Sequence, residues 1–344
     1  MDMINRFGIE QRRRKRSILV LSVLGALIVI TFIISMNTGF IRLSPLDVLK
    51  TLFGMGTSKQ ELILFDFRLP RIVISVLIGA GLAVSGCILQ GVTRNALADP
   101  GLLGINAGAG LAVILFVCFY PSTSSVPVFG LPLLALLGAG LTALLIFGLA
   151  HKKNEGVSPT SLILTGIAVA AGINAAMIVL TLTLSPEQYQ FVATWIAGSI
   201  WGANWKFVLA LLPWIVILLP YVMWKANMMN ILNLSDQTAA GLGAPIAASR
   251  GKLMFAAVAL AGSCVAVSGG IGFVGLIGPH LARTLVGPKH QQLLPASAMV
   301  GALLTIIADT ISRSMSSAEI PTGVVVAVIG APYFLYLLAR TKSS

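Results

Sequence analysis

Few residues in this sequence could carry out covalent chemistry, and none has the spacing of a catalytic centre. The 344 residues include three histidines, three cysteines and eleven carboxylates. There is no G-x-x-x-x-G-K-[ST] loop, no H-E-x-x-H motif, and no set of His, Cys and carboxylates at ligand spacing. Cys87, Cys118 and Cys264 lie inside apolar runs without paired spacing, which favours packing over a disulfide or metal site. We therefore predict no catalytic residue, no metal site and no cofactor bound by this chain; any ATP hydrolysis must be done by another chain.

Two arginines, Arg68 and Arg71, stand three residues apart at the start of an apolar segment, with Pro70 suited to a first helical turn. The charge distribution described below indicates that this segment lies outside the cell. Cations there oppose both the positive-inside bias and the helix dipole, whose N-terminus prefers anions. The arginines are therefore predicted to meet an external negative partner. Local pairing with Asp66, or contact with lipid phosphate, is the alternative.

Ionisable residues late in the chain have simpler explanations. Asp309 and Arg313 lie four residues apart, so an ion pair within one helix explains them without a ligand. His280 follows Pro279 where a shortened helix would meet the cytoplasmic side. Hydrogen bonding at that helix end is favoured there over a titrating or metal-binding role.

A segment between two apolar runs, residues 225–252, is predicted to run through the cytosol. Ser235 can cap a short helix that Gly241 or Gly243 ends, and a second short helix can start at Pro245. The first helix would expose apolar surface, which favours docking into a groove of a partner protein over lying on the membrane surface. The apolar positions concerned are Ala239, Ala240 and Leu242.

The composition requires a membrane to surround this chain. Apolar residues make up 57% of it and charged residues 10%, whereas a soluble domain carries about 25% charged residues. The 35 glycines suit close helix packing, because lipid tails leave no hydrophobic force to drive helices together. The net charge of +12 lies in short clusters between apolar runs, which fits membrane topology better than a nucleic-acid surface.

Apolar runs long enough to cross a bilayer core of about 30 Å recur along the chain. Lysine and arginine counts favour two crossings in the longest run, which is interrupted at Ser268-Gly269-Gly270 and at Gly278-Pro279. Two crossings leave 16 of the 23 basic residues in the cytoplasm, and one crossing leaves 13. The sequence thus predicts an all-α polytopic membrane protein with ten transmembrane helices and both termini cytoplasmic. The runs are 17–36, 72–91, 97–119, 128–150, 158–184, 207–224, 253–286, 295–311 and 322–339.

The chain is predicted to form one transmembrane domain, residues 17–344, after a basic cytoplasmic segment, residues 1–16. That segment ends in Arg12-Arg13-Arg14-Lys15-Arg16. The apolar run that follows is too long for a signal-peptide core and has no clear small-residue cleavage site after it, so it is interpreted as an uncleaved first span.

A weak internal repeat predicts two related halves. Residues 82–88 (LAVSGCI) recur as 265–271 (VAVSGGI), and Gly79 corresponds to Gly262 at the same offset of 183. Repeated halves are common in transporters, where a pathway forms between the bundles. The halves would cover about residues 60–200 and 245–340.

Four longer motifs follow one another along the chain and carry a specific resemblance. They are Arg68-Leu69-Pro70-Arg71; Gly86 through Gln90, leading to Asn95-Ala96-Leu97-Ala98-Asp99-Pro100-Gly101-Leu102-Leu103-Gly104; Gly270-Ile271-Gly272-Phe273-Val274-Gly275-Leu276-Ile277-Gly278-Pro279-His280; and Glu319-Ile320-Pro321-Thr322-Gly323. In this order they resemble the FecCD family, the permease subunits of ATP-binding-cassette (ABC) importers for ferric siderophores, haem and cobalamin. The resemblance runs from about Arg42 to Arg340.

The resemblance implies a multi-pass cytoplasmic-membrane permease that works in a larger assembly. Its expected partners are a second permease subunit, either a copy or a paralogue, two ABC ATPase subunits, and a lipoprotein that delivers the cargo from outside. No nucleic acid is expected. The chain itself would not be an enzyme, because separate subunits hydrolyse ATP.

The resemblance also implies roles for particular residues. Those expected to receive acidic side chains of the binding protein are Arg68, Arg71 and Arg313. Coupling helices that contact the ATPases would match residues 235–250, and include Ser235, Asp236, Ala239, Ala240, Gly241, Leu242 and Gly243. The cytoplasmic gate would be lined by Asn95, Leu97, Thr160 and Ser161.

The function expected from this resemblance is import of an iron–siderophore complex by alternating access. Haem or cobalamin import within the same family is the alternative cargo. An ion-coupled secondary transporter would need buried carboxylates as relays, for which Asp99 and Asp309 are the candidates. A membrane-embedded enzyme would need a facing nucleophile and base, and no such pair is visible in the sequence.

Overall fold

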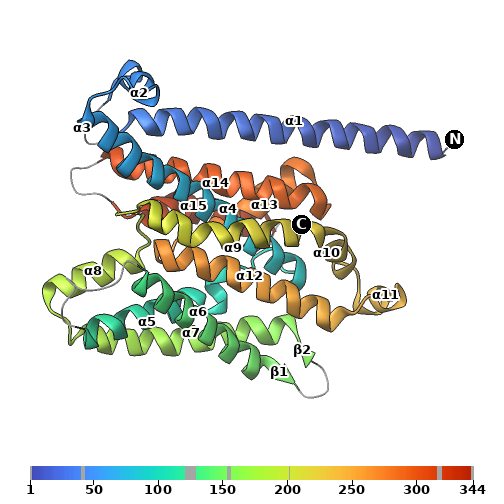
Figure 1. Ribbon diagram of the computed structural model, residues 1–344. Coiled ribbons are helices and arrows are strands. Elements are labelled where there is room, and N and C mark those ends of the chain that lie inside the picture. Colours follow the sequence, from blue (N-terminus) through green and yellow to red (C-terminus); the bar gives the residue numbers. More distant parts are fainter. Residues whose placement is uncertain are drawn as a thin grey trace.

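The computed structural model is a bundle of roughly aligned helices (Figure 1) and describes residues 2–39, 43–120, 129–152, 156–200, 202–315 and 320–341. Several sequence features therefore lie outside the described residues. These are residue 1, residue 128 at the start of a predicted span, Glu319 of the last motif, and the chain end from residue 342. Among the described residues, one short antiparallel hairpin of β1 (His151–Lys152) and β2 (Gly156–Val157) interrupts the helices.

The helical elements follow one another with short connections. They are α1 (Asp2–Asn37), α2 (Pro45–Leu52), α3 (Ser58–Glu61), the π-helix η1 (Leu62–Arg68), α4 (Leu69–Thr93), the 3-10 helix η2 (Pro100–Leu103), α5 (Ile105–Phe119), α6 (Gly130–Ala150), α7 (Pro159–Thr181), α8 (Pro186–Ile196), α9 (Trp205–Trp224), α10 (Ala226–Leu232), α11 (Asp236–Gly241), α12 (Ile246–Ser268), α13 (Val274–Val286), α14 (His290–Met315) and α15 (Thr322–Thr341).

Seven helices in the described residues are long and apolar enough to cross a membrane. The apolar helices Ile105–Phe119 and Thr322–Tyr336 are shorter, and α13 has 13 residues. The chain is thus an all-helical, multi-pass membrane protein, as its composition predicted. Helices suit this setting because a bilayer core offers no water to the backbone, so the segment must satisfy its own hydrogen bonds.

The second predicted span starts earlier than its apolar run indicated. We expected a helix from residue 72, but α3, η1 and α4 form one continuous helix, Ser58–Thr93. Pro70 therefore does not begin the helix; it follows the π-helical turn η1. A wider turn is a common way to accommodate a proline inside a helix, because the proline cannot donate its backbone hydrogen bond.

The third predicted span, 97–119, is broken near its start. Asp99 caps η2 by accepting a hydrogen bond from the Gly101 amide at 2.7 Å, and Gly104 turns the chain with a φ of 67°. The α-helix α5 therefore begins at Ile105. Hydropathy alone does not detect such a cap inside an apolar run.

The long run 253–286 divides once. The predicted break at Gly269 is confirmed: α12 ends there with a φ of 66°, and an added Cβ would lie 1.9 Å from the Trp195 carbonyl oxygen. Only glycine fits this position. We expected a second interruption at Pro279, but the helix continues there, because Pro279 lies inside α13. His280 is therefore in the middle of a helix and not at its end. Its ring meets Tyr333 edge-on at 5.9 Å.

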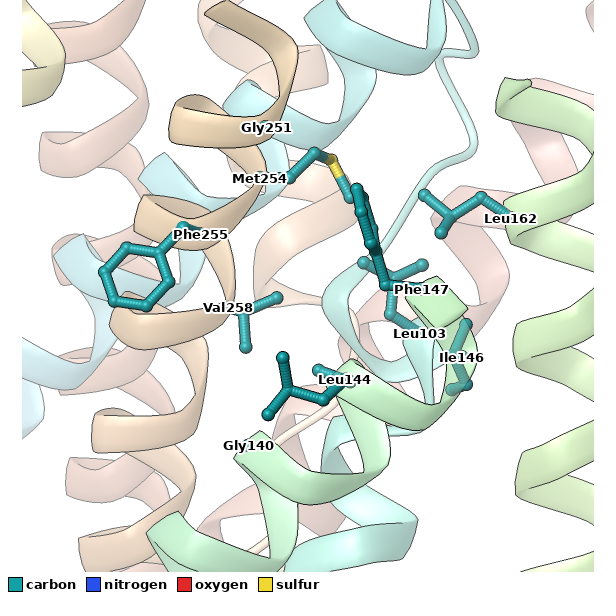
Figure 2. Close-up of a pocket in the computed structure, with 11 residues that line it drawn as sticks. Leu103, Gly140, Leu144, Ile146, Phe147, Leu162, Gly251, Met254, Phe255 and Val258 are labelled. Carbon is teal, nitrogen blue, oxygen red and sulfur yellow. The ribbon is translucent and has the colours of Figure 1, made fainter. Parts of the chain in front are cut away.

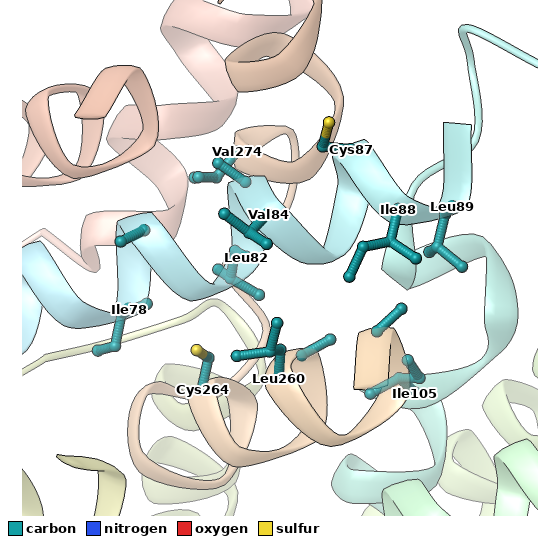
Figure 3. Packing of buried hydrophobic residues seen from close by; sticks show 14 of the residues in the cluster. Ile78, Leu82, Val84, Cys87, Ile88, Leu89, Ile105, Leu260, Cys264 and Val274 are labelled. Atoms are coloured by element: carbon teal, nitrogen blue, oxygen red, sulfur yellow. The ribbon is translucent and has the colours of Figure 1, made fainter. Parts of the chain in front are cut away.

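The core of the bundle is α4, which contacts α9, α12, α13 and α14. In Figure 3, Leu82 of α4 faces Leu260 and Cys264 of α12. Cys87 and Cys264 are fully buried in this packing, the role predicted for them. Helices α4 and α14 also approach closely, since a Cβ on Gly79 would lie 2.3 Å from the carbonyl oxygen of Gly301.

The two copies of the weak repeat adopt different local structures. Residues 82–88 lie within α4, whereas residues 265–271 include the end of α12 and the turn after it. The difference follows from Gly269, whose positive φ ends the helix. In the other copy the helix continues through Gly86, which packs against the backbone of Gly275. A relationship between the two halves remains a prediction.

The bundle has two distinct ends in Figure 1. The N-terminus of α1, the β1–β2 hairpin and α11 lie at one end, which we call the α11 end. Helices α2, α3 and α8 lie at the other, which we call the α8 end. Helix α1 continues without a break through the predicted basic segment, so residues 2–16 extend the first span as helix.

Candidate functional site

The three predicted docking arginines, which we call the arginine cluster, gather at the α8 end of the bundle. Arg68 closes η1, Arg71 is in the first turn of α4, and Arg313 is in the last turn of α14. Their exposed fractions are 5%, 8% and 9%. The sequence predicted their position near a membrane boundary but not that they would be buried.

Asp309 holds two of these arginines. Its Oδ1 lies 2.9 Å from Nε of Arg71, and its Oδ2 lies 3.1 Å from Nε of Arg313. The Thr322 hydroxyl donates a further hydrogen bond to Oδ1 at 3.3 Å. The predicted ion pair between Asp309 and Arg313 is confirmed, but the contact with Arg71 on another helix was not foreseen. Asp309 is fully buried, so its charge depends on these partners.

The last turn of α1 covers the other side of the arginine cluster. Arg68 donates a short hydrogen bond to the Met36 carbonyl oxygen. Arg313 donates to the Ser35 hydroxyl and to the Thr38 carbonyl oxygen, the latter at 3.4 Å. A helix C-terminus leaves carbonyl groups without partners and carries partial negative charge, so it attracts cations. The end of α1 thus stabilises the cluster without neutralising it.

In the part of the chain that the structure describes, the arginine cluster combines one buried carboxylate with neutral acceptors. Arg71 and Arg313 contact the carboxylate of Asp309, and the acceptors that α1 contributes to Arg68 and Arg313 are neutral oxygens. An arginine binds a carboxylate more strongly than a neutral carbonyl, often through two parallel hydrogen bonds. The geometry therefore suits an incoming acidic side chain.

A second charged group lies at the α11 end, and we call it the Asp236 cluster. Arg250 of α12 donates two hydrogen bonds to the Asp236 carboxylate, at 2.8 and 3.0 Å. Arg94, which ends α4 in a left-handed conformation, donates to the same carboxylate and to the Leu232 carbonyl oxygen. The bonds from Arg250 first, and then from Arg94, hold the pKa of Asp236 below its ordinary value of 3.8. One carboxylate thus joins α11 to α4 and α12.

The short helix predicted after Ser235 exists as α11. Ser235 caps it by accepting a hydrogen bond from the Thr238 amide at 3.1 Å, and the helix ends at Gly241, before Gly243 with a φ of 75°. Both features were predicted. The second short helix that we expected from Pro245 is absent in the described structure, since the helix beginning at Ile246 continues to Ser268 as α12.

Exposure along α11 differs from the prediction at one residue. Ala239 is fully buried, because α11 lies against α10 and α12, so the expectation that it would be exposed is wrong. Ala240 is exposed, and Leu242 after the helix has 63% of its surface exposed. The apolar surface left for a partner is therefore centred on Leu242.

The four predicted gate residues lie in two segments that approach each other. The Asn95 side chain accepts a hydrogen bond from the Leu97 amide at 2.9 Å, in the turn after α4. Thr160 and Ser161 are in the first turn of α7, which contacts η2. The neighbouring Leu103 and Leu162 line one groove, between α6 and α12 (Figure 2). A role in gating stays a prediction.

Comparison with known proteins agrees with this arrangement. Residues 27–340 match the model of the FecCD transport family. The chain belongs to the FecCD family. It is 51% identical over 335 residues to the iron(3+)-hydroxamate import system permease protein FhuG of Bacillus subtilis (strain 168), covering 96% of this chain and 99% of FhuG. It is 44% identical over 328 residues to the Fe(3+)-citrate import system permease protein YfmE of the same organism, covering 95% and 96% of the two chains.

The fold of this FecCD protein is also found in a solved structure. A metal-chelate type ABC transporter in an inward-facing conformation aligns with a TM-score of 0.82 and 33% identity, covering 93% of this chain and 99% of the other. The likeness extends over nearly the whole chain. This protein is therefore a multi-pass transport permease, and its activity concerns movement of a cargo across a membrane.

Two partners in this FecCD permease were missed by sequence reasoning. Asp309 was assigned to Arg313 alone, and no role was given to the end of α1 around Ser35. A signal existed for the second, because the carbonyl groups at the end of a helix attract cations. No local signal indicated the contact between Asp309 and Arg71, which are 238 residues apart.

Proposed function

We propose that this chain is the permease subunit of an ABC importer in the cytoplasmic membrane, and that its cargo is a ferric siderophore delivered by a binding lipoprotein. The relatives named for iron-hydroxamate and iron-citrate import support this cargo class. The observation that carries the proposal is that α4 joins two charged clusters. Arg71 lies at one end of the helix, and Arg94 ends the other beside Asp236.

The proposed topology has ten crossings, with both termini and α11 in the cytoplasm. Seven long helices and three shorter ones, α5, α13 and α15, supply these crossings. Residues 225–252 would then form the cytoplasmic coupling segment of one domain, 17–344. The common location of the N-terminus of α1 and α11 at one end of the bundle supports this orientation.

At the outer surface, the arginine cluster would receive acidic side chains of the binding lipoprotein. Since Arg68 and Arg313 already bond to oxygens at the end of α1, docking exchanges those neutral acceptors for carboxylates. The stronger hydrogen bond that an arginine makes to a carboxylate favours this exchange. Movement of the α1 end away from α4 would accompany it.

At the inner surface, α11 would contact an ABC ATPase, with one ATPase for each of two permease subunits. Leu242, directly after this helix, is a large exposed apolar residue and would enter a groove of the ATPase. Because Asp236 bonds to both Arg94 and Arg250, a displacement of α11 would be passed to α4 and α12. Those helices lie beside the segments that carry Asn95 and Ser161, so the gate would respond.

The contact with the ATPase is tested by purifying the assembled complex. Replacing Leu242 by aspartate should strongly reduce the amount of ATPase that co-purifies with the permease. Gln237→Glu, an exposed charge change in the same helix, is the matched control and should leave the assembly intact. Equal ATPase recovery in both variants would contradict the coupling role of α11.

Ion-coupled secondary transport is the rival mechanism, with Asp99 and Asp309 as its candidate relays. Both carboxylates have structural partners: Asp99 caps η2, and Asp309 bridges two arginines. A relay must gain and lose its ion during transport, which these fixed partners oppose. Haem or cobalamin remains the alternative cargo within the family.

The deciding experiment is uptake into vesicles that contain the whole importer. Labelled ferric siderophore should enter only when ATP and the binding lipoprotein are both present. Uptake driven by an ion gradient without ATP would overturn the proposal. If the vesicles take up haem or cobalamin but no ferric siderophore, the proposed cargo is wrong, whereas the assignment to an ABC importer still holds.

A charge exchange tests the docking surface directly. Arg68→Glu should lower uptake about tenfold or more at limiting lipoprotein, because one desolvated charge pair is worth roughly 2 kcal/mol or more. An acidic residue of the lipoprotein changed to arginine should restore uptake in this variant. Lys59→Glu is the control, since Lys59 is exposed at the same end. If none of the lipoprotein's acidic residues restores uptake when it is changed to arginine, docking does not occur at Arg68.

A further inference from the structure

One carbonyl group of the π-helix η1 lacks its regular donor. At the end of η1 the Leu69 amide donates to the Leu64 carbonyl oxygen, five residues back, and not to that of Phe65, four residues back. The amide five residues after Phe65 would belong to Pro70, which has no amide proton. The helix therefore supplies no regular partner for the Phe65 carbonyl oxygen. Such a group is usually satisfied by a side chain or by water.

Trp205 of α9 supplies a donor to this group. Its indole Nε1–H donates to the Phe65 carbonyl oxygen at 2.8 Å, across 140 residues of sequence. Trp205 is the first residue of α9, and Asn204 fixes that helix start by accepting hydrogen bonds from the Lys206 and Phe207 amides at 3.0 and 3.3 Å. An indole N–H can only donate, so it matches a carbonyl that needs a donor.

The indole bond favours the π-helical register of η1, that is, the pairing of each amide with the carbonyl five residues back. In a regular α-helix the Leu69 amide would pair with Phe65. The carbonyl without a donor would then be that of Asp66, four residues before Pro70. The Phe65 carbonyl needs the indole only in the π-helical arrangement, so the bond from Trp205 stabilises that register relative to the α-helical one.

The register decides which way Arg68 points. Ile63 and Arg68 are five residues apart and are both buried, with 9% and 5% of their surface exposed. At 3.6 residues per turn their side chains would point about 140° apart, whereas a π-turn brings residues five apart to one face. Ile63 packs in an apolar cluster with Met36 of α1, and Arg68 donates to the carbonyl oxygen of Met36. The π-turn thus lets both side chains reach the end of α1.

We propose that Trp205 is a positioning residue for the docking surface, because its bond to Phe65 holds η1 in the register that turns Arg68 toward the arginine cluster. The effect on docking rests on the proposed function, whereas the effect on the register does not. Trp205 is 41% exposed at the same end of the bundle, so direct contact with the lipoprotein is the competing explanation. The experiments below separate the two.

The register is tested by hydrogen exchange of the purified full-length chain without partners. Trp205→Phe keeps an aromatic ring but removes the N–H. It should raise exchange of the amides in residues 62–69 about fivefold, the ratio that corresponds to roughly 1 kcal/mol for the net contribution of one hydrogen bond. Trp214→Phe, about 13 Å further along α9, is the matched control and should not alter this exchange. Equal exchange in the two variants would overturn the proposal.

Pro70→Ala gives a second test of the same bond. The new amide can donate to Phe65 in the π-helical register or to Asp66 in the α-helical one, so the helix no longer needs the indole. Adding Trp205→Phe to Pro70→Ala should therefore leave the exchange of residues 62–69 unchanged. A rise as large as in Trp205→Phe alone would mean that Trp205 acts on η1 through packing, and the proposal would be wrong.

The docking role is tested by the affinity of the binding lipoprotein for the assembled importer. Trp205→Phe should weaken binding about two- to fivefold, since the fraction of chains with Arg68 correctly placed falls by no more than the register equilibrium shifts. In an Arg68→Gln background the same change should have no effect, because Trp205 acts through Arg68. An equal loss in both backgrounds would indicate direct contact with the lipoprotein and would exclude the positioning role.

The same measurements distinguish this proposal from the proposed function. If Arg68→Gln weakens binding but Trp205→Phe does not, docking at Arg68 stands and the role of Trp205 is refuted. If Arg68→Gln leaves the affinity unchanged, docking at Arg68 and the role of Trp205 are refuted together.

Discussion

Replacing Asp309 by asparagine should destabilise the protein far more than removing the charge of an exposed carboxylate. Asp309 is fully buried and contacts both Arg71 and Arg313, whose side chains are 9% and 7% exposed. Asparagine keeps the size of the side chain and can still accept the hydrogen bond from Thr322. The loss is therefore electrostatic, because two buried guanidinium groups keep their charge while the carboxylate that faced them becomes neutral. Breaking a buried pair in this way costs about 3–5 kcal/mol.

The free energy of unfolding can be measured by titrating the purified chain with SDS in mixed micelles and following its helical circular dichroism. Asp66→Asn is the control, since Asp66 is exposed at the same end of the bundle and should change stability by about 0.5 kcal/mol or less. A variant with Asp309→Leu, Arg71→Met and Arg313→Met should recover much of the stability, because apolar replacement of a buried charged group is often neutral. Equal stability of Asp309→Asn and Asp66→Asn would refute the reasoning.

Three further outcomes are expected at the other end of the bundle and in its core. Asp236→Asn should raise hydrogen exchange of the amides in α11 several-fold, because the helix loses its attachment to α4 and α12; unchanged exchange would contradict the attachment. In the original chain, hydrogen exchange of the α11 amides should be the same at pH 8 and pH 5 once it is corrected for intrinsic exchange rates. The folded pKa of Asp236 lies below 3.8, so its contribution is complete above that value and is lost only as the pH falls through the folded pKa. Gly86→Ala should abolish the yield of monodisperse protein, since its Cβ would lie 1.8 Å from the carbonyl oxygen of Gly275, whereas Gly140→Ala should be tolerated; equal yields would argue against this packing.

The close packing of α4 against α14 gives a physical route between the two charged clusters. Gly79 and Gly301 bring the two backbones into contact, so neither helix can slide without moving the other. Helix α14 carries Asp309 near one end and begins at the other with His290, which bonds to Asn230 of α10. Both helices thus extend from the arginine cluster to the segment that precedes α11.

Features with a local cause could be predicted from the sequence. The membrane-spanning helices follow from apolar runs, because any such run must satisfy its backbone in the bilayer. The Ser235 cap and the break at Gly269 depend on the side chain or backbone freedom of one residue and its near neighbours. The family could be identified in the same way, since its motifs are contiguous stretches of sequence.

Boundaries inside those runs were less predictable. Helix α4 is preceded by further turns of helix back to Ser58, and η2 separates α5 from the start of its apolar run. Hydropathy measures how apolar a segment is but does not show at which residue the helix begins or ends. Those positions depend on a capping carboxylate at Asp99 and on a wider turn before Pro70.

Sequence alone determined that this chain is a polytopic helical permease of the FecCD family with three arginines near the ends of its apolar runs. The tertiary structure decided what those arginines contact, because Asp309 meets Arg71 across 238 residues and the end of α1 supplies further acceptors. It also decided that Ala239 is buried and that a groove remains between α6 and α12. Burial and charge pairing depend on which helices become neighbours, and that is set by the packing of the whole bundle and not by any local stretch.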